Sequence, residues 1–359
     1  MLPLPATAAD LTPEWLTSAM EGAPGWEFDR ITSVDLEPLG ARDSLQGDVY
    51  RADVGVTGED GVVESNQLLI KMHDPAAEGR GTSQYRAEAY FYREVASRTG
   101  IPVPATYVSA YDEHTGRMLI IQEYLAEGHI GGTGSSFGAD DLVRVLGTLA
   151  RLHSTWWKSP LLDELPGIRR FDAMRRTIVR LDQDISAVIG FLERFGKLIN
   201  PAVAEYYATL PEWIEPVEAK LSQTLTLIHL DAQSKNIFIP TDSTRNPVLF
   251  DWALFVAGNP ALDLATLLSF SVDRREHGRL EQPVRQYHEM LLGHGVRDYA
   301  FEQLWDDFRL ASAFHLVRPV GLARAGSAKW NAHVRQVIPR LDSIVLGTGA
   351  LEALDELSA

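Results

Sequence analysis

The chain has 359 residues, a hydrophobic fraction of 45% and a formal net charge of −16. Because single cores stop growing at roughly 250–300 residues, this length predicts two parts with separate cores. The acidic balance argues against nucleic acid as a partner and would suit a cationic substrate, although acidic charge serves solubility equally well. With no cysteine, the chain has no disulfide, thiol nucleophile or zinc–thiolate site.

The start of the chain lacks the basic flank and long apolar core of an export signal. No later stretch has the length and hydrophobicity of a membrane span. We therefore expect a cytoplasmic protein with no membrane partner.

The first part of the chain is rich in predicted strands. Thr12 and Pro13 are typical of a helix start. Strands are predicted at 31–39, 47–56 and 67–72, then a helix at 83–99 and a hairpin of 105–111 with 118–124. Residues 1–125 are therefore predicted to form a small domain with an antiparallel sheet.

The remainder is predicted to be a larger helical domain, residues 126–359. Its first residues, 126–136, are rich in glycine and typical of a linker. The overall fold class is therefore α+β. Helices are predicted at 140–157, 171–195, 201–221, 263–272, 283–294, 301–325 and 329–346.

Three oxygen-bearing side chains follow apolar runs in the second part: Asp231, Asn236 and Asp251. Phosphoryl transfer needs a carboxylate that orients the attacking hydroxyl and accepts its proton, which suits Asp231. It also needs hard oxygen ligands for Mg²⁺, which suits Asn236 and Asp251. A lone Asp after an apolar run is usually a turn residue. The three together, with an apolar strand at 237–239 between them, favour a kinase site.

A lysine that binds phosphate is expected in the first part, and Lys71 ends a strongly apolar strand. The alternative is an edge-strand lysine that prevents aggregation. Its predicted partner is Glu88, which lies on the apolar face of the following helix, in preference to Glu94.

Two glycine-containing segments compete to cover the phosphates. Residues 40–47 lie between two strands, where Ser44 and backbone amides could donate to phosphate oxygens. Residues 131–138 contain more glycine but lack the strand-to-helix turn of a dinucleotide fingerprint, so we interpret them as linker.

Two histidines and one further aspartate are candidates for roles near this site. His153 lies on an apolar helical stripe and is more consistent with a hydrogen-bonded core residue than with a catalytic one. His229 is expected to fix the loop that carries Asp231. Asp263 follows a turn and is predicted to be a plain helix N-cap.

These motifs together resemble a known family. His229-x-Asp231-x4-Asn236, then Phe250-Asp251-Trp252 and 258–265, are similar to the aminoglycoside phosphotransferase and choline kinase-like family. Residues 149–157 are similar to the helix that this family, including ecdysteroid kinase-like members, places before its catalytic loop. The resemblance covers about 39–268 and implies a bilobal protein-kinase-like fold.

The resemblance also implies roles for individual residues. Asp231 would be the catalytic base, Asn236 and Asp251 the magnesium ligands, and Lys71 with Glu88 the phosphate-binding pair. The backbone of Glu123 to Leu125 would bind adenine. ATP is the implied donor, although the residues do not distinguish it from GTP, and Mg²⁺ the implied metal.

Two positions depart from common family patterns. Leu230 stands where many members have glycine, which would alter the packing of the loop. Gln233 matches choline kinases, whereas protein kinases have lysine there. The second departure favours a small-molecule substrate over a protein.

The predicted function is thus phosphoryl transfer to a hydroxyl of a small molecule, such as an aminoglycoside, amino alcohol, sugar or other natural product. Trp305, Asp306 and Asp307 are candidates for binding a cationic acceptor. One alternative is a retired kinase that binds nucleotide without turnover, which the intact Lys71 and Asp231 argue against. Another is a Mg²⁺-dependent hydrolase, against which the lack of a histidine-rich ligand set counts.

Overall fold

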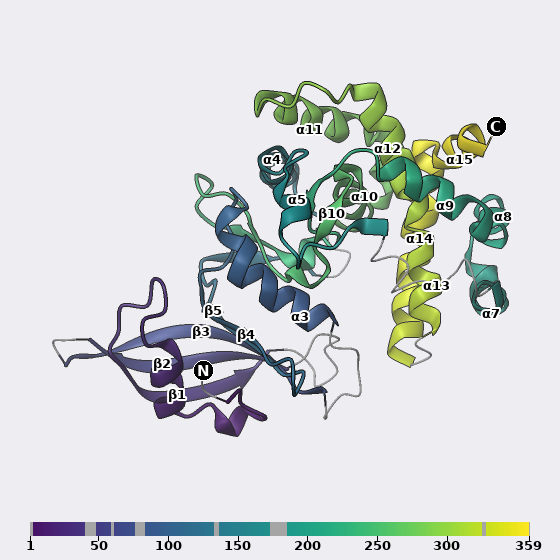
Figure 1. Ribbon diagram of the computed structural model, residues 1–359. Coiled ribbons are helices and arrows are strands. Elements are labelled where there is room, and N and C mark those ends of the chain that lie inside the picture. The colour runs from purple at the N-terminus through teal and green to yellow at the C-terminus, as the bar shows by residue number, and fades with distance from the viewer. Residues whose placement is uncertain are drawn as a thin grey trace. The chain divides into compact units, whose positions relative to one another are not determined.

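The computed structural model describes residues 3–39, 48–58, 61–75, 83–132, 136–172, 185–324 and 328–358 (Figure 1). The chain forms two compact units: Met1–Gly128 with Val248–Leu254, and His129–Pro247 with Phe255–Ala359. Residues 248–254, which the sequence placed in the second domain, thus pack with the first unit. Within the described ranges, no helix is both long and apolar enough to cross a membrane.

The first unit is built on a five-stranded antiparallel sheet of order β1-β2-β3-β5-β4 (Figure 1). Helix α1 (Pro13–Met20) packs against β1, and the Thr12 hydroxyl caps it by accepting the N–H of Trp15. The strands are β1 (Arg30–Pro38), β2 (Asp48–Thr57), β3 (Val63–His73), β4 (Thr106–Tyr111) and β5 (Met118–Glu123).

The two faces of β3 serve different purposes. Leu68, Ile70 and Met72 belong to the apolar core that also contains residues of α1. Since side chains alternate along a strand, Lys71 points to the opposite face. Helix α3 (Ser83–Tyr90) packs against β4 and β5.

The predicted helix 83–99 is less regular than expected. After α3 the chain continues as a π-helical turn, Phe91–Val95, and a 3₁₀ turn, Ala96–Arg98. The change begins at Phe91, whose ring stacks on Trp252 with centroids 4.0 Å apart. Such π turns occur where a side chain must be re-aimed, often at functional sites.

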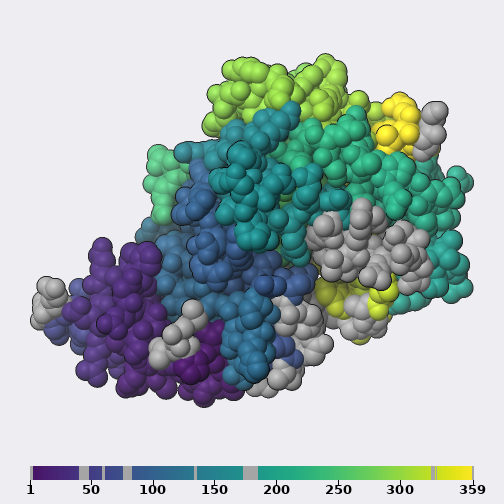
Figure 2. Space-filling view, viewed as in Figure 1, coloured from purple at the N-terminus to yellow at the C-terminus, as the bar shows by residue number. Residues whose placement is uncertain are grey.

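The second unit is mainly helical, and α10 lies at its centre. Every residue of α10 is buried, and it packs against α12 and α14. Figure 2 shows α11, in light green, on the surface of this unit. The helices are α4 (Ala139–Thr155), α5 (Leu161–Glu164), α7 (Ile185–Phe195), α8 (Pro201–Ala208), α9 (Leu210–Leu221), α10 (Pro260–Ser271), α11 (Glu281–Gly293), α12 (Phe301–Phe314), α13 (Val317–Arg324), α14 (Ala328–Thr348) and α15 (Ala350–Ser358).

Two predicted helices are divided in the structure. The helix expected at 201–221 is α8 and α9, with Pro211 in the first turn of α9. The helix expected at 301–325 is α12 and α13, which begins two residues before Pro319. Proline has no N–H and crowds the carbonyl four residues earlier, so each helix is interrupted upstream of its proline. Helix α15 was not predicted.

Short strands carry the candidate chemical segments. Strand β7 (Thr226–Ile228) pairs with β10 (Val256–Gly258) in antiparallel register. Three further strands are β6 (Gly128–Ile130), β8 (Ile237–Pro240) and β9 (Val248–Leu249). Asp231 lies in the loop between β7 and β8, and Asp251 follows β9.

Candidate active site

Lys71 is the centre of a buried ionic cluster in the first unit. Its Nζ lies 2.8 and 2.7 Å from the two carboxylate oxygens of Glu88 and 3.1 Å from Oδ1 of Asp251. The three side chains are 8%, 3% and 8% exposed. Burial alone would lower the pKa of Lys71, but the charges of Asp251 and Glu88 outweigh it and raise that pKa. Lys71 is therefore charged. It is paired with buried carboxylates and is not an edge-strand lysine that prevents aggregation.

When Glu88 is ionised, the cluster carries one negative charge in excess, because one ammonium faces two carboxylates. Burial, with the Asp251 charge, raises the pKa of Glu88 to about 7 even though Lys71 opposes this shift. An excess of buried negative charge suits a cation that arrives with a ligand.

Aromatic packing holds the Asp251 segment in the first unit. The Trp252 ring is fully buried against Phe91, and its Nε1 donates to the carbonyl of Leu249 at 3.1 Å. Asp251 itself has φ 65°, a left-handed conformation that costs energy for any residue with a Cβ. Its ion pair with Lys71 compensates for part of that strain.

Asp231 is the centre of a second ionic cluster, in the second unit. Its Oδ1 accepts hydrogen bonds from Gln233 Nε2 at 2.6 Å and from Arg318 Nη2 at 2.7 Å. Its Oδ2 accepts from Asn236 Nδ2 at 2.8 Å and lies 3.3 Å from Lys235 Nζ. Burial would raise the pKa of this carboxyl, but Arg318 and Lys235 outweigh burial and hold the pKa below its usual range. Asp231 is thus buried and ionised.

Asp263 holds the backbone that leads into Asp231. Its Oδ2 accepts the N–H of His229 at 2.8 Å, and its Oδ1 accepts the N–H of Leu230 at 2.6 Å. Leu230 has φ 64°, a conformation that glycine adopts without strain, and these two hydrogen bonds maintain the strained turn.

The prediction of Asp263 as a helix N-cap is therefore wrong. Asn259 caps α10, because its Oδ1 accepts the N–H of Ala261 at 2.9 Å. Asp263 lies one turn further along the helix and is fully buried. The cap prediction failed because a local pattern cannot show that a distant loop supplies the backbone donors.

Both histidines have the positional roles expected of them. His153 Nε2 lies 3.2 Å from Asp263 Oδ2, and its Nδ1 lies 2.7 Å from the Tyr287 hydroxyl, so it is a hydrogen-bonded core residue. The ring of His229 accepts the N–H of Asp231 at 3.3 Å and so helps to fix the loop.

Comparison with known proteins decides the family. The model of the phosphotransferase enzyme family matches residues 56–305. The chain belongs to the phosphotransferase enzyme family. A search of curated proteins finds no match.

Solved structures of this phosphotransferase type share its fold. Spectinomycin phosphotransferase in complex with ADP and spectinomycin has a TM-score of 0.55 at 13% identity, with 95% of this chain and 99% of that chain covered. A GDP complex of aminoglycoside 2′-phosphotransferase-IIIa has a TM-score of 0.58 at 14% identity, covering 92% and 98%. Macrolide 2′-phosphotransferase from Brachybacterium faecium has a TM-score of 0.53 at 17% identity, covering 85% and 93%. The predicted protein-kinase-like fold, with a sheet-rich unit and a helical unit, is confirmed.

Two of the remaining predicted site residues, Glu123 and Leu125, lie at and just after the end of β5. Glu123 ends β5, and its side chain accepts the N–H of Ala105 at 2.8 Å, so it joins β5 to the segment before β4. Its backbone N–H donates to the carbonyl of Ala105. Leu125, two residues later, is partly buried. Ser44 lies outside the described residues.

The two acidic residues suggested for the acceptor differ in burial, and only Asp307 is held by internal hydrogen bonds. Asp307 is buried and accepts from the Tyr299 hydroxyl at 2.7 Å and from Asn259 Nδ2 at 2.9 Å. Burial raises the pKa of Asp307. Asp306 is mostly exposed beside Arg309, and the Trp305 ring packs on Phe308. Asp307 thus stabilises the fold of the phosphotransferase and is not available to an acceptor.

Sequence reasoning missed three residues of this site: Asp263 as a positioning residue, and Lys235 and Arg318 as partners of Asp231. A signal existed for Asp263, which is the one acidic residue of a largely apolar helical segment. Arg318 had no comparable local signal, because 87 residues separate it from Asp231.

The donor set is compatible with a magnesium ion that binds together with a nucleotide. Among the described residues, no group of three or more acidic or histidine side chains could hold a metal on its own. Magnesium usually takes only one or two protein carboxylates and completes its shell with water and phosphate oxygens. Asp251 is such a carboxylate in a cluster with excess negative charge. Asn236 uses its amide nitrogen on Asp231, which leaves the amide oxygen as the atom suited to a cation.

Proposed function

We propose that this phosphotransferase moves the γ-phosphoryl group of ATP to a hydroxyl of a small molecule in a magnesium-dependent reaction. The observation that carries the proposal is the state of Asp231, a carboxylate that is 4% exposed yet ionised within a loop built to orient it. Phosphoryl transfer through a loose transition state needs the acceptor hydroxyl to be positioned rather than deprotonated early. A base of low pKa suits that task.

Lys71 and Glu88 would supply the phosphate-binding pair. Glu88 holds the ammonium of Lys71 in one orientation inside a site from which water is largely excluded. In such surroundings a fixed positive charge stabilises phosphate oxygens more strongly than it would in water. Ser44 and the backbone around Glu123 and Leu125 are proposed to contact the nucleotide.

Magnesium, when bound, would neutralise the charge that develops on the phosphate oxygens, with Asn236 and Asp251 as its protein ligands. The residues of this chain then have two tasks. Lys71 binds phosphate, and Asp231 orients the hydroxyl and accepts its proton. ATP is the proposed donor, and GTP is the alternative, since related structures contain ADP or GDP.

The test is ADP release from MgATP with a panel of small hydroxyl compounds, with nucleotide binding measured separately. Asp231→Asn should lower turnover by about 10²–10⁴-fold, the usual contribution of a positioned acid or base. It should leave nucleotide affinity nearly unchanged. Asp140→Asn, at an exposed aspartate in the first turn of α4, is the matched control and should be fully active.

The same experiment separates the alternatives. If nucleotide binds but no acceptor raises turnover above that of Asp231→Asn, the protein is a retired kinase. If inorganic phosphate forms without any phosphorylated acceptor, the protein is a hydrolase. Phosphorus NMR of the products distinguishes these outcomes from transfer.

A further inference from the structure

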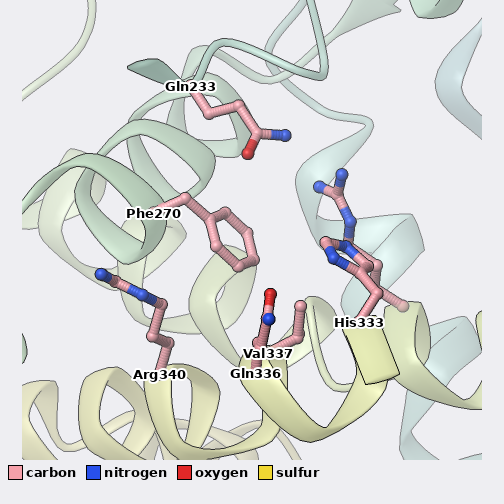
Figure 3. A pocket seen from close by; sticks show the side chains of 7 residues that line it. Gln233, Phe270, His333, Gln336, Val337 and Arg340 are labelled. Carbon is pink, nitrogen blue, oxygen red and sulfur yellow. The ribbon is translucent and has the colours of Figure 1, made fainter. Parts of the chain in front are cut away.

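A pocket of about 220 Å³ lies beside Asp231 in the second unit (Figure 3). Its walls include Gln233 of the catalytic loop, Phe270 of α10, Arg318 of α13 and Gln336 of α14. Figure 3 shows the side chains of Phe270 and Gln336 extending toward each other. Gln233 and Arg318 are also the two residues that donate to Oδ1 of Asp231. The pocket is therefore next to the candidate base.

The charged side chains that line this pocket are cationic. Arg318 and Arg340 line it, and none of its described lining residues is a carboxylate. Arg340 donates to the carbonyls of Ser269 and Val272, and its charge also interacts with that of Asp273. The Arg318 guanidinium lies 5.1 Å from the centre of the Phe270 ring.

The titration of His333, another lining residue, agrees with a positive field. Burial lowers the pKa of His333, and the charges of Arg318 and Lys235 lower it further, against an opposing effect of Asp231. The effects of Arg318 and Lys235 on this pKa have the sign expected beside cationic side chains.

The carboxylate of Asp231 is surrounded by cationic and amide groups, so an acceptor hydroxyl must take the place of one of them. An ionised carboxylate offers about four lone-pair sites. Four donor groups surround this one, two at each oxygen. A hydroxyl can reach Oδ1 only if Gln233 or Arg318 withdraws.

Of the two donors to Oδ1, Arg318 is the one more readily displaced. Gln233 is 3% exposed and lies in the same loop as Asp231, two residues away. Arg318 comes from α13, outside that loop, and its side chain is 24% exposed. An anionic group in the pocket would offer this guanidinium a second partner with matching bidentate geometry.

We propose that the acceptor is a small hydroxyl compound that carries a carboxylate or phosphate, and that this anion draws Arg318 away from Asp231. The inference rests on the proposed function and names its substrate class. The acceptor oxygen then forms a bond to the γ-phosphorus, the bond from that phosphorus to the ADP oxygen breaks, and the hydroxyl proton passes to Asp231. A cationic acceptor is repelled by Arg318 and leaves Asp231 blocked.

The pocket is small and partly open to solvent. Its volume of about 220 Å³ is below the roughly 300–1,000 Å³ of typical drug-sized sites. It equals on the order of seven waters at about 30 Å³ each. This is the scale of one sugar ring or a small hydroxy acid.

The experiment compares four ring compounds of similar size: glucuronate, glucose 6-phosphate, glucose and glucosamine. Their binding is measured by titration calorimetry with MgADP present, on the native enzyme, Arg318→Gln and Arg318→Glu. We expect at least one of the two anions to bind more than 10-fold tighter than glucosamine. Arg318→Gln should reduce that preference by about 10-fold or more, since a hydrogen bond to a charged group contributes roughly 1.5–3 kcal/mol. Arg318→Glu should reverse it.

Arg335→Gln is the matched control, because Arg335 is an exposed arginine of α14 outside the lining of the pocket. It should retain the full preference for anions. The inference is overturned if neither anion binds more tightly than glucosamine, or if the preference for anions survives Arg318→Glu. Comparison of the two anions identifies carboxylate or phosphate as the group recognised.

Turnover on the same compounds separates this inference from the proposed function. Faster ADP release with glucosamine than with both anions would overturn the inference and leave phosphotransfer intact. Selective anion binding without phosphorylation of any acceptor would support the anion pocket and count against the proposed function. Arg318 is a positioning residue, so its loss should raise KM for an anionic acceptor while KM for MgATP stays the same.

Discussion

Lys71 and Asp231 are each the centre of a buried ionic cluster, but the two clusters are opposite in charge. Lys71 is one cation between two carboxylates, whereas Asp231 is one carboxylate between two cations, Arg318 and Lys235. The charge of the first cluster therefore favours a further cation, and the charge of the second cluster favours a further anion.

The clusters also differ in how exposed the partners are. The side chains around Lys71 are no more than 8% exposed, while those of Arg318 and Lys235 are 24% and 34% exposed. The first cluster is thus a fixed structure that keeps one charge in place. The second has partners that can exchange, as expected where an acceptor must approach the base.

Substituting the lysine of each cluster tests this difference in exposure most strongly. Lys71→Met leaves two buried carboxylates without their cation and should lower the free energy of unfolding by about 3–5 kcal/mol. Lys235→Met makes the same substitution at a more exposed pair and should cost at most about 1 kcal/mol. Urea unfolding of both variants is the measurement. Equal losses would contradict the distinction between a fixed and an exchangeable cluster.

Asp263 tests whether the second cluster depends on its backbone support. In Asp263→Asn one oxygen is replaced by an NH₂ group, which cannot accept the N–H of Leu230 or His229. A displaced Asp231 should lower kcat by roughly 10–100-fold, with KM for MgATP unchanged.

Asp307→Asn is the matched control, because Asp307 is another buried aspartate of the same unit. It should lower stability but leave kcat near that of the native enzyme. A similar fall in kcat for both variants would show that any loss of packing in this unit impairs turnover.

The two clusters should respond differently to acid. The pKa of Glu88 is raised from 4.5 to about 7, so the native state binds a proton that the unfolded chain has released. The stability that this proton contributes is fully present below pH 4.5 and is lost as the pH rises through about 7. Asp231 has the opposite shift, so its contribution is lost only at lower pH, as the pH falls.

Glu88→Gln should therefore remove that pH dependence. Between about pH 5 and about pH 7, the difference in unfolding free energy between native and variant should change by on the order of 1–3 kcal/mol. Glu94→Gln, at an exposed glutamate paired with Arg93, is the control and should follow the native curve. Parallel curves for Glu88→Gln and the native enzyme would refute the raised pKa.

The smallest change in stability is expected for a substitution at Leu230. Leu230→Gly relieves a left-handed conformation that costs roughly 1–2 kcal/mol, against about 0.5–1 kcal/mol of added unfolded-state entropy. The variant should be slightly more stable, by about 0.5 kcal/mol. Leu225→Gly, at a partly buried leucine with negative φ on the other side of β7, should be less stable than the native enzyme. Thermal unfolding of the pair decides this, and a destabilised Leu230→Gly would mean that its side chain outweighs the strain.

Local patterns were sufficient to predict the strands and most helices, because alternation and helical spacing record which face of each element is buried. They also predicted that Lys71 pairs with Glu88 rather than Glu94, since an apolar helical face predicts burial and a buried glutamate needs a cation. The phosphotransferase family was likewise readable from the spacing of Asp231, Asn236 and Asp251.

Only the tertiary structure decided where residues distant in sequence meet. It assigned 248–254 to the first unit, made Asp263 a support of the Asp231 loop, and brought Arg318 to the base. Each result depends on contacts between segments far apart in the chain, and neither periodicity nor propensity encodes such contacts. The sequence therefore determined the elements and the chemical class, whereas the charge of the pocket beside Asp231 was decided by packing, because Arg318 reaches it from another helix.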